Sequence, residues 1–343
     1  MTALDEGRHL GDAVASVFAQ DYPGPLELVV AVGPSRDGTE QLALRLAEDH
    51  PDMRVVANPT GRTPAGLNLA IAATDPNRPI VVRTDGHAHL PPDYVRCAVE
   101  AMQRTGAANV GGMMVPEGVT PFECAVARAM SERIGIGEAA FHVGGEPGPA
   151  PTVYLGVFRR SVLERTGGFD EHFARAQDWE LNHRIRELGE LIWFEPGLQV
   201  RYRPRSNVRR LAHQFHGSGL WRWQIVRAYP QTVNLRYLAA PSATLAIGAA
   251  AIALLVDAAV VHSAAIAAIA AAVPGLYAAV VLGGAALTRR GLSPRASLAY
   301  PAVLATMHLS WGAGFLSGPV RDVLRTLGRR RAARPATGER ASA

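Results

Sequence analysis

The sequence predicts an α/β fold over residues 1–237, followed by a membrane domain at 238–320. Two observations carry this prediction. Helical and strand patterns alternate through the first 200 residues, which is typical of a mainly parallel sheet flanked by helices. From Leu238 onward, Ala, Leu, Val and Ile dominate and charged residues become rare. The boundary between the two parts is therefore expected near Arg236.

The expected elements follow one another closely along the first part. They are a helix at 10–19, a strand at 26–32, a helix at 38–50, a strand at 54–56, a helix at 64–73, a strand at 80–83, and a helix at 178–188 capped by Asp178. In sheets of this kind, ligands bind beyond the carboxyl ends of the strands. The polar residues that follow the strands at 26–32 and 80–83 are therefore the first candidates for a binding site.

The chain has no lysine, so arginine replaces it as the strongly basic residue throughout. The formal net charge is +5. Many arginines lie at 201–210, 289–295 and 321–334, next to or between apolar segments. Since no aromatic-interleaved basic motif accompanies them, anionic lipids or diphosphates are favoured as partners over nucleic acid. Cys97 and Cys124 have no metal or redox spacing, which fits a reducing cytoplasm.

The segment Gly33–Thr39 reads GPSRDGT and follows the first apolar strand. The carboxylate of Asp37, at the end of this strand, is able to accept a hydrogen bond from a nucleobase NH group. The alternative is an ordinary turn that starts the next helix, since such turns are common.

The segment Arg83–His87 reads RTDGH and directly follows the apolar run Ile80–Val82. A divalent metal held by Asp85 and His87 would neutralise the charge of a departing nucleotide diphosphate. Both side chains reach one site only if the chain turns at Gly86. An ordinary turn at the end of a strand remains the alternative.

The segment Gln177–Asn182 reads QDWELN and opens a helix. An inverting sugar transfer needs a carboxylate that removes the proton of the acceptor hydroxyl, and Asp178 is our candidate for this base. In the alternative, Asp178 is only a helix cap, and Glu180 forms a surface ion pair with Arg184.

The segment Gln214–Trp223 reads QFHGSGLWRW. We expect a loop, made mobile by Gly217 and Gly219, that closes over the donor diphosphate at the membrane surface. Arg222 would bind this diphosphate. The alternative is an aromatic belt at the membrane interface.

Taken in order, these motifs resemble glycosyltransferase family 2, and within it the succinoglycan-type exopolysaccharide glycosyltransferases. The resemblance covers residues 4 to about 237, and its specificity rests on the number and order of the motifs. The matching segments are Asp5-Glu6, Ala19–Pro23, Ser35–Thr39, Asn68, Asp85–His87, Gly168–Glu171 and Asp178–Leu181.

The resemblance implies a GT-A fold and a metal-dependent inverting mechanism with Mg²⁺ or Mn²⁺ as cofactor. It implies that Asp37 binds the base or ribose, that Asp85 and His87 lie at the ribose and metal, and that Asp178 is the base. By the same resemblance, Asp5, Glu6 and Asn68 are expected to bind the nucleotide sugar.

The chain departs from the family pattern in several places. Met1–Ala3 stands where a buried first strand should end, so we expect this strand to be missing and an upstream in-frame start to encode it. His87 replaces the usual aspartate of the metal motif, and Gln177 replaces an acidic residue before the base. The Gln-x-x-Arg-Trp signature of processive synthases is absent, which predicts transfer of a single sugar.

The apolar part contains two segments, 238–256 and 264–287, that are each long enough to span a bilayer. A third segment, 296–320, contains proline, histidine and glycines. It is either re-entrant or a span that places the basic tail outside, against the positive-inside rule, and we favour a span because its apolar content is high. The basic tail at 321–343 is expected to be disordered. A buried helical bundle of a soluble protein is the alternative for the whole region.

The charge distribution predicts the orientation in the membrane. Met1–Val17 carries four charged residues and no apolar signal core, so the first domain is expected to stay in the cytoplasm. Arg289, Arg290 and Arg295 follow the second span and obey the positive-inside rule. We therefore expect a multi-pass protein of the inner membrane.

The resulting functional hypothesis is transfer of a hexose from a nucleotide sugar, with UDP as the expected nucleotide, to a hydroxyl of a polyprenyl-linked glycan. Membrane lipids are the other expected partners. One alternative is a polyprenyl-phosphate sugar synthase, whose phosphate acceptor needs no general base. The other is a non-catalytic membrane scaffold that keeps a degenerate transferase domain.

Overall fold

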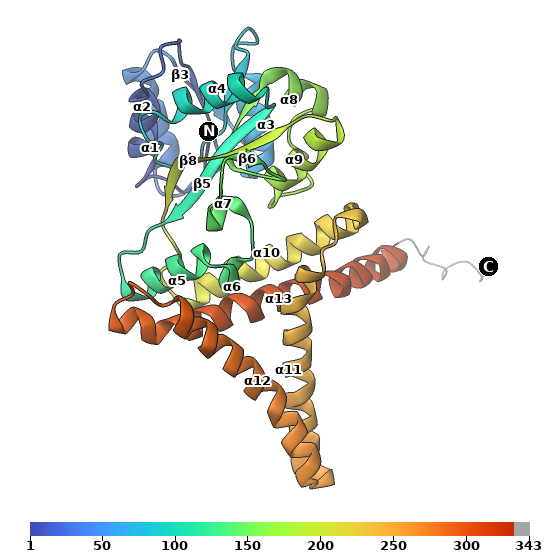
Figure 1. Ribbon diagram of the computed structural model, residues 1–343. Coiled ribbons are helices and arrows are strands. Elements are labelled where there is room, and N and C mark those ends of the chain that lie inside the picture. The colour runs from blue at the N-terminus through green and yellow to red at the C-terminus, as the bar shows by residue number, and fades with distance from the viewer. Residues whose placement is uncertain (333–343) are drawn as a thin grey trace, which may run out of the picture. The chain divides into compact units, whose positions relative to one another are not determined.

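The computed structural model describes residues 1–332, which divide into two compact units (Figure 1). The α/β unit comprises residues 1–206 together with the helical segment 284–304. The helical unit comprises residues 207–283 and the chain from Ala305 onward. The boundary at 206–207 lies about 30 residues before the one expected from composition, because the helix before the first apolar segment groups with the helical unit.

The first sheet of the α/β unit is parallel throughout and has the strand order β1-β2-β3. Its elements are β1 (Thr2–Ala3), α1 (Leu10–Phe18), β2 (Leu28–Val32), α2 (Thr39–Asp49), β3 (Met53–Ala57) and α3 (Thr63–Ala72). Helices α1 and α2 pack together on one face of β2, whereas Ala70 of α3 packs on the other (Figure 1). All five residues of β2 are buried for this reason, as in other helix-covered parallel sheets.

The residues expected to be only the end of the first strand form β1, a strand of two residues. Thr2 and Ala3 pair in parallel with Ala31 and Val32 of β2. Thr2 also forms a parallel bridge to Asp85, so β1 lies between β2 and the segment that follows the strand at 80–82. A cavity of about 120 Å³ beside Met1 is lined by residues of both neighbouring strands. The short strand β1 and this cavity therefore lie next to each other.

The second sheet is mixed and has the strand order β4-β7-β5-β8-β6. Its strands are β4 (Ile80–Val82), β5 (Asn109–Pro116), β6 (Gly148–Pro149), β7 (Tyr154–Arg159) and β8 (Ile192–Tyr202). Strand β7 runs antiparallel to both β4 and β5, and β6 runs antiparallel to β8. Only β5 and β8 are parallel neighbours. A buried strand has an apolar sequence whether it runs parallel or antiparallel to its neighbours. The sequence therefore did not indicate that β7 is antiparallel.

The remaining helices of this unit connect or cover the strands. They are α4 (Tyr94–Thr105), α5 (Pro121–Ser131), α6 (Arg133–Ile136), α7 (Ala140–Val143), α8 (Arg160–Thr166) and α9 (Gln177–Glu187). Thr120 and Glu123 form a capping box at the start of α5.

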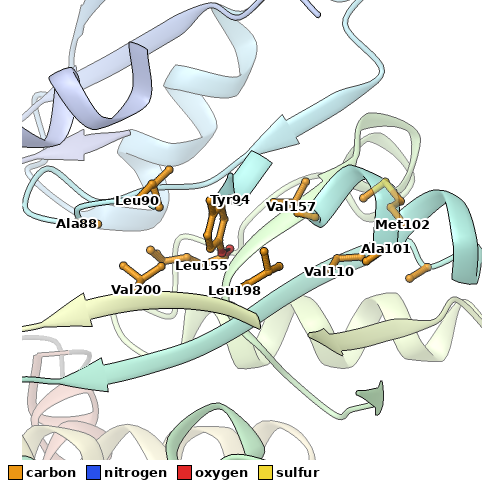
Figure 2. Close-up of a cluster of buried hydrophobic side chains, with 12 residues drawn as sticks. Ala88, Leu90, Tyr94, Ala101, Met102, Val110, Leu155, Val157, Leu198 and Val200 are labelled. Atoms are coloured by element: carbon orange, nitrogen blue, oxygen red, sulfur yellow. Dashed lines mark hydrogen bonds between the residues drawn. The ribbon is translucent and has the colours of Figure 1, made fainter. Parts of the chain in front are cut away.

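Tyr94 of α4 lies at the centre of the buried cluster that holds α4 against the second sheet. Figure 2 shows its ring among Leu90, Leu155, Val157, Leu198 and Val200. Its hydroxyl donates a hydrogen bond of 2.6 Å to the carbonyl of Leu155, so the buried polar group is satisfied. This packing fixes the chain that leads from β4 into α4.

The helical unit contains α10 (Val208–Ala228), α11 (Ala239–Val256), most of α12 (Ala264–Thr288) and the later part of α13 (Pro294–Ala332). Short helical turns occur at Pro230–Thr232, Leu235–Leu238 and Asp257–Val261. Within the described residues, two helical stretches, Leu235–Val261 and Ala264–Thr288, are long and apolar enough to cross a membrane. Both are only 11% buried by protein, which leaves their apolar side chains exposed. They match the first two segments expected from the sequence.

A span at the third apolar segment, 296–320, stays a prediction. The segment belongs to α13, a single helix of 39 residues, which is not among the candidate spans of the described chain. Ala296, Tyr300, Val303 and Leu304 on this helix are fully buried. One face of α13 is therefore covered by protein. The helix also includes residues 321–332 of the tail that we expected to be disordered, and residues 333–343 lie outside the described part.

The segment Gln214–Trp223 is also not the loop that we expected, because it forms the middle of α10. A Cβ atom at Gly219 would overlap the carbonyl oxygen of Trp311 on α13, and one at Gly314 would overlap that of His216. These glycines allow the backbones of α10 and α13 to approach closely. Gly219 therefore serves helix packing, and the segment does not form the mobile loop that we expected.

Gly219→Ala should therefore destabilise the helical unit. We expect a loss of about 1–3 kcal/mol from overpacking, measured as a lower melting temperature of the detergent-solubilised chain. Gly248→Ala on α11 is the matched control, because a Cβ there meets nothing within 4 Å. Alanine should be neutral or stabilising at that position, since it favours the helix. Equal melting temperatures for the two variants would contradict the packing role of Gly219.

Candidate active site

The loops that follow β1 and β2 are joined by hydrogen bonds at the carboxyl ends of these strands. The Oδ1 of Asp5 accepts from the amide of Arg36 at 2.9 Å, and the amide of Asp5 donates to Ser35 Oγ at 3.0 Å. The amide of Gly7 donates to Asp37 Oδ2 at 2.8 Å. Because neighbouring parallel strands end at the same edge of the sheet, Asp5 and Asp37 come together across 32 residues of sequence.

Asp37 is held in one orientation by its own turn. Its Oδ1 accepts from the hydroxyl of Thr39 at 2.5 Å and from the amide of Thr39 at 3.2 Å. The Thr39 hydroxyl and the Gly7 amide together lower the pKa of Asp37 below its usual value, since these donors favour the charged form. Asp37 therefore presents a fixed, ionised carboxylate at the start of α2.

His87 is joined to the loop that follows β1. Its Nδ1 lies 2.6 Å from Oε1 of Glu6, and the amide of Glu6 donates to Thr39 Oγ1 at 2.8 Å. The hydrogen bond with Glu6 raises the pKa of His87. The chain turns between Asp85 and His87 as expected, and the amide of Gly86 donates to the carbonyl of Thr2. We refer to Asp5, Glu6, Asp37, Asp85 and His87 as the strand-end cluster.

Arg83 links the strand-end cluster to helix α9. Its Nη2 donates to Asp85 Oδ1 at 2.8 Å, and its Nη1 donates to Asp178 Oδ2 at 3.0 Å. The side chain of Arg83 is only 6% exposed. Sequence reasoning missed this residue as a functional one. The sequence feature that could have indicated it is an arginine at the end of a buried apolar strand, because a buried charge needs a partner.

Asp178 lies in the first turn of α9 and does not cap it, which corrects our expectation. The N-cap position is Ala176, with φ of 61° and no side-chain hydrogen bond. Burial raises the pKa of Asp178, and the charge of Arg83 partly opposes this shift. Among the described residues, Asp178 Oδ1 has no hydrogen-bond partner. One oxygen is therefore held by Arg83 and the other is left for a further donor.

The pair of Glu180 and Arg184 exists as expected, but it is buried and not on the surface. Glu180 is 0% exposed, and its Oε1 accepts from Arg184 Nε at 2.6 Å. Arg184 also donates to the carbonyls of Thr166 and Gly168. The pair therefore anchors the loop before Phe169 to α9, as a buried charge with a full set of partners.

Asn68 binds the same loop and does not belong to the strand-end cluster. Its Nδ2 donates to the carbonyl of Phe169 at 2.8 Å, and its Oδ1 accepts from the amide of Phe169 at 2.9 Å. Gly168, at φ of +77°, allows the chain to turn there, and a Cβ would come within 2.7 Å of Asn68 Oδ1. We interpret Asn68 as a residue that holds this loop.

Asn68→Ala should consequently lower stability more than donor affinity. Loss of both hydrogen bonds is expected to cost about 1–3 kcal/mol of folding free energy, measured by thermal unfolding. Asn77→Ala, at an exposed turn of the same unit, serves as the control. A large loss of nucleotide affinity at unchanged melting temperature would instead assign Asn68 to the donor site.

Arg222 lies on α10, which belongs to the helical unit, whereas the residues of the strand-end cluster belong to the α/β unit. Its guanidinium stacks over the ring of Tyr237 at 4.6 Å from the ring centroid. This cation–π contact joins Arg222 to Tyr237 within the helical unit.

The strand-end cluster contains oxygen and nitrogen donors of the kinds that divalent metals bind. Within residues 1–332, no group of three or more His, Cys, Asp or Glu side chains forms a metal site by itself. Asp85 and His87 would supply two ligands to a metal whose other ligands come from substrate phosphates. The bond between Glu6 and His87 Nδ1 leaves Nε2 of His87 for the metal, and such carboxylate partners orient metal-binding histidines.

The family model and a curated relative that match this chain agree with each other. Residues 1–167 match the family model of glycosyl transferase family 2. The succinoglycan biosynthesis protein ExoA of Rhizobium meliloti (strain 1021) is 29% identical over 313 residues, which is 91% of each chain.

A second relative and a solved structure extend the comparison. The dolichyl N-acetyl-alpha-D-glucosaminyl phosphate 3-beta-D-2,3-diacetamido-2,3-dideoxy-beta-D-glucuronosyltransferase of Methanococcus voltae is 22% identical over 65% of this chain and 72% of that protein. The mannosyltransferase PcManGT of Pyrobaculum calidifontis, solved with GDP-Man and Mn²⁺, superposes with a TM-score of 0.60 at 22% identity. This superposition covers 92% of this chain and 85% of the other, and it shows the GT-A fold.

Proposed function

Because the chain belongs to glycosyltransferase family 2, we propose that it transfers a single sugar, with inversion, from a nucleotide-sugar donor to a lipid-linked glycan. The observation that carries this proposal is the link from Asp85 through Arg83 to Asp178. It joins a carboxylate suited to the donor side with a carboxylate whose buried Oδ1 has no hydrogen-bond partner among the described residues. A group transfer needs both, because the leaving group and the acceptor react on opposite sides of the sugar.

In the proposed reaction, Oδ1 of Asp178 takes the proton of the acceptor hydroxyl as its oxygen bonds to the anomeric carbon. The bond between this carbon and the diphosphate oxygen breaks on the opposite face, and the diphosphate leaves with the electron pair. Configuration at the anomeric carbon is thereby inverted. The buried carboxylate, held by Arg83, is ready to accept this proton when its pKa lies below the working pH.

A divalent metal would neutralise the departing diphosphate when bound. We propose that Asp85 and Nε2 of His87 hold it, with Glu6 orienting the imidazole. Asp37 and Asp5, on the neighbouring loops, would bind the nucleoside part of the donor. The mannosyltransferase PcManGT was solved with Mn²⁺, which is in line with this choice of cofactor.

Two relatives support the proposed acceptor. The Methanococcus voltae protein acts on a dolichyl-phosphate-linked sugar, and the Rhizobium meliloti protein takes part in succinoglycan biosynthesis. We therefore propose a polyprenyl-linked glycan as acceptor and polysaccharide biosynthesis as the process. The nucleotide is open between uridine and guanosine, since PcManGT binds GDP-Man.

We further propose that the protein is a multi-pass protein of the inner membrane with the α/β unit in the cytoplasm. The two candidate spans support this placement, as do Arg289, Arg290 and Arg295 directly after the second of them. A lipid-linked acceptor and a soluble donor would then meet on the same side of the membrane.

The test is a donor screen with UDP and GDP sugars, a lipid extract as acceptor, and Mn²⁺ or Mg²⁺. Incorporation of a single labelled sugar into the lipid fraction supports the proposal. Formation of a long polymer would contradict transfer of a single sugar. Incorporation that survives Asp178→Ala unchanged would favour a polyprenyl-phosphate acceptor, because a phosphate needs no general base.

A further inference from the structure

We propose that Arg83 is the positioning residue of the active site, which holds the base Asp178 at a set place relative to the metal-side carboxylate Asp85. This inference rests on the proposed function. Nothing in the family motifs assigns a role to this arginine, which ends the apolar run of β4.

The backbone and side chain of Arg83 are both fixed. Its amide donates to the carbonyl of Gly156 on β7 at 3.0 Å, so β4 and β7 hold the main chain. Its side chain is 6% exposed and meets the two carboxylates through different terminal nitrogens, at 2.8 and 3.0 Å. A guanidinium is planar and presents its donors in a rigid fork. The directions of the two carboxylates are therefore set by a single group.

Oδ1 of Asp178, the proposed proton acceptor, is buried and takes no part in the contact with Arg83. Arg83 engages Oδ2, whereas Oδ1 has no hydrogen-bond partner among the described residues. A buried carboxylate with one oxygen bound has little freedom to rotate, so Oδ1 keeps its direction. This arrangement suits a base that must meet a hydroxyl, since catalysis depends steeply on such alignment.

Helix α9 is attached to the sheet by contacts that do not involve Arg83. Asn182, one turn after Asp178, accepts from Asn109 Nδ2 on β5 at 2.7 Å and donates to Thr152 Oγ1 at 2.9 Å. Leu181 and Ile185 are fully buried on the same helix. Loss of the Arg83 side chain should therefore release the carboxylate of Asp178 while α9 stays in place.

Arg83 also places one positive charge between two negative ones. Without it, Asp85 would still be neutralised by the metal once the donor has bound. Among the described residues, Arg83 is the cationic partner of Asp178, so the position of this carboxylate depends on Arg83. The effect of removing Arg83 is thus expected on turnover more than on donor binding.

The test compares Arg83→Met and Arg83→Lys with Arg54→Met, a control at an exposed ion pair of the same unit. Turnover is measured with the donor selected in the screen, and affinity is measured by titration with UDP or GDP and Mn²⁺. We expect Arg83→Met to lower kcat by about 10²-fold or more, within the range that a general base contributes. Nucleotide affinity should change by less than about threefold. Lysine should restore only part of kcat, because one ammonium cannot reproduce the fork.

The double variant Arg83→Met/Asp178→Asn separates positioning from a general effect on folding. If Arg83 acts through Asp178, it should lower kcat by little more than Asp178→Asn alone, since residues that act as a unit are not additive. Full activity of both Arg83 variants, or additive losses in the double variant, would overturn the proposal. If Arg83→Met does not fold, Arg83→Lys carries the comparison. Full activity of Asp178→Asn would instead remove the base from the proposed function.

Discussion

Asp178→Asn should lower kcat by about 10²- to 10⁴-fold while the affinity for the nucleotide stays near that of the wild type. Asparagine has nearly the same shape and is able to keep one hydrogen bond from Arg83, but it cannot take a proton. Because the lost interaction exists only as the acceptor is deprotonated, the change falls on the transition state. The measurement is a comparison of kcat with the dissociation constant of the donor nucleotide.

The control for this variant is Glu164→Gln, which removes an exposed carboxylate on α8 of the same unit. It should leave kcat within about twofold, in line with the small effect of most surface substitutions. Equal kcat values for Asp178→Asn and the wild type would show that Asp178 is not the base.

The pH dependence of kcat provides a second measurement on Asp178. Burial raises its pKa, so the carboxylate is protonated at a higher pH than an exposed aspartate. Only the ionised form accepts a proton, and kcat should therefore decline on the acid side around a pKa above the ordinary aspartate value. This acid limb should disappear in the residual activity of Asp178→Asn.

Asp85→Asn should remove metal-dependent donor binding as well as turnover. We expect a loss of about 10²-fold or more in kcat/KM, because charge stabilisation by a bound metal is worth several kcal/mol. In contrast to Asp178→Asn, the affinity for UDP or GDP in the presence of Mn²⁺ should fall. Titration of the nucleotide with and without Mn²⁺ gives this difference directly.

Asp52→Asn, at an exposed position before β3, is the matched control for Asp85→Asn. It should keep both the metal dependence and the nucleotide affinity of the wild type. Undiminished turnover of the wild type in excess chelator would rule out the metal assignment of Asp85 and His87, whatever the variants do.

The sequence indicated the correct fold class because its signals are local. The valine-rich run at β2 and the polar turn after it mark a buried strand that leads into a helix. The turn at Gly86 was expected from Asp85 and His87 being two residues apart. Each of these features depends on residues within about ten positions of one another.

Features that depend on distant packing were predicted less well. Two glycines in the segment Gln214–Trp223 favoured a loop, since glycine costs about 1 kcal/mol in a helix. The structure has a helix there because Gly219 lets α10 approach α13 closely, and this contact involves a residue 92 positions later. Apolar residues are favoured where a helix is buried by protein and also where it is surrounded by lipid. The apolar content of 296–320 therefore does not distinguish these two environments.

The sequence by itself determined the α/β class, the two candidate spans, and the order of the motifs that carry Asp37, Asp85 and Asp178. Only the tertiary structure decided which of these residues meet. Arg83 and Asp178 are 95 positions apart and come into contact through the docking of α9 on the second sheet. A buried charge must find a partner, but the sequence does not say which one. The packing of strands and helices makes that choice.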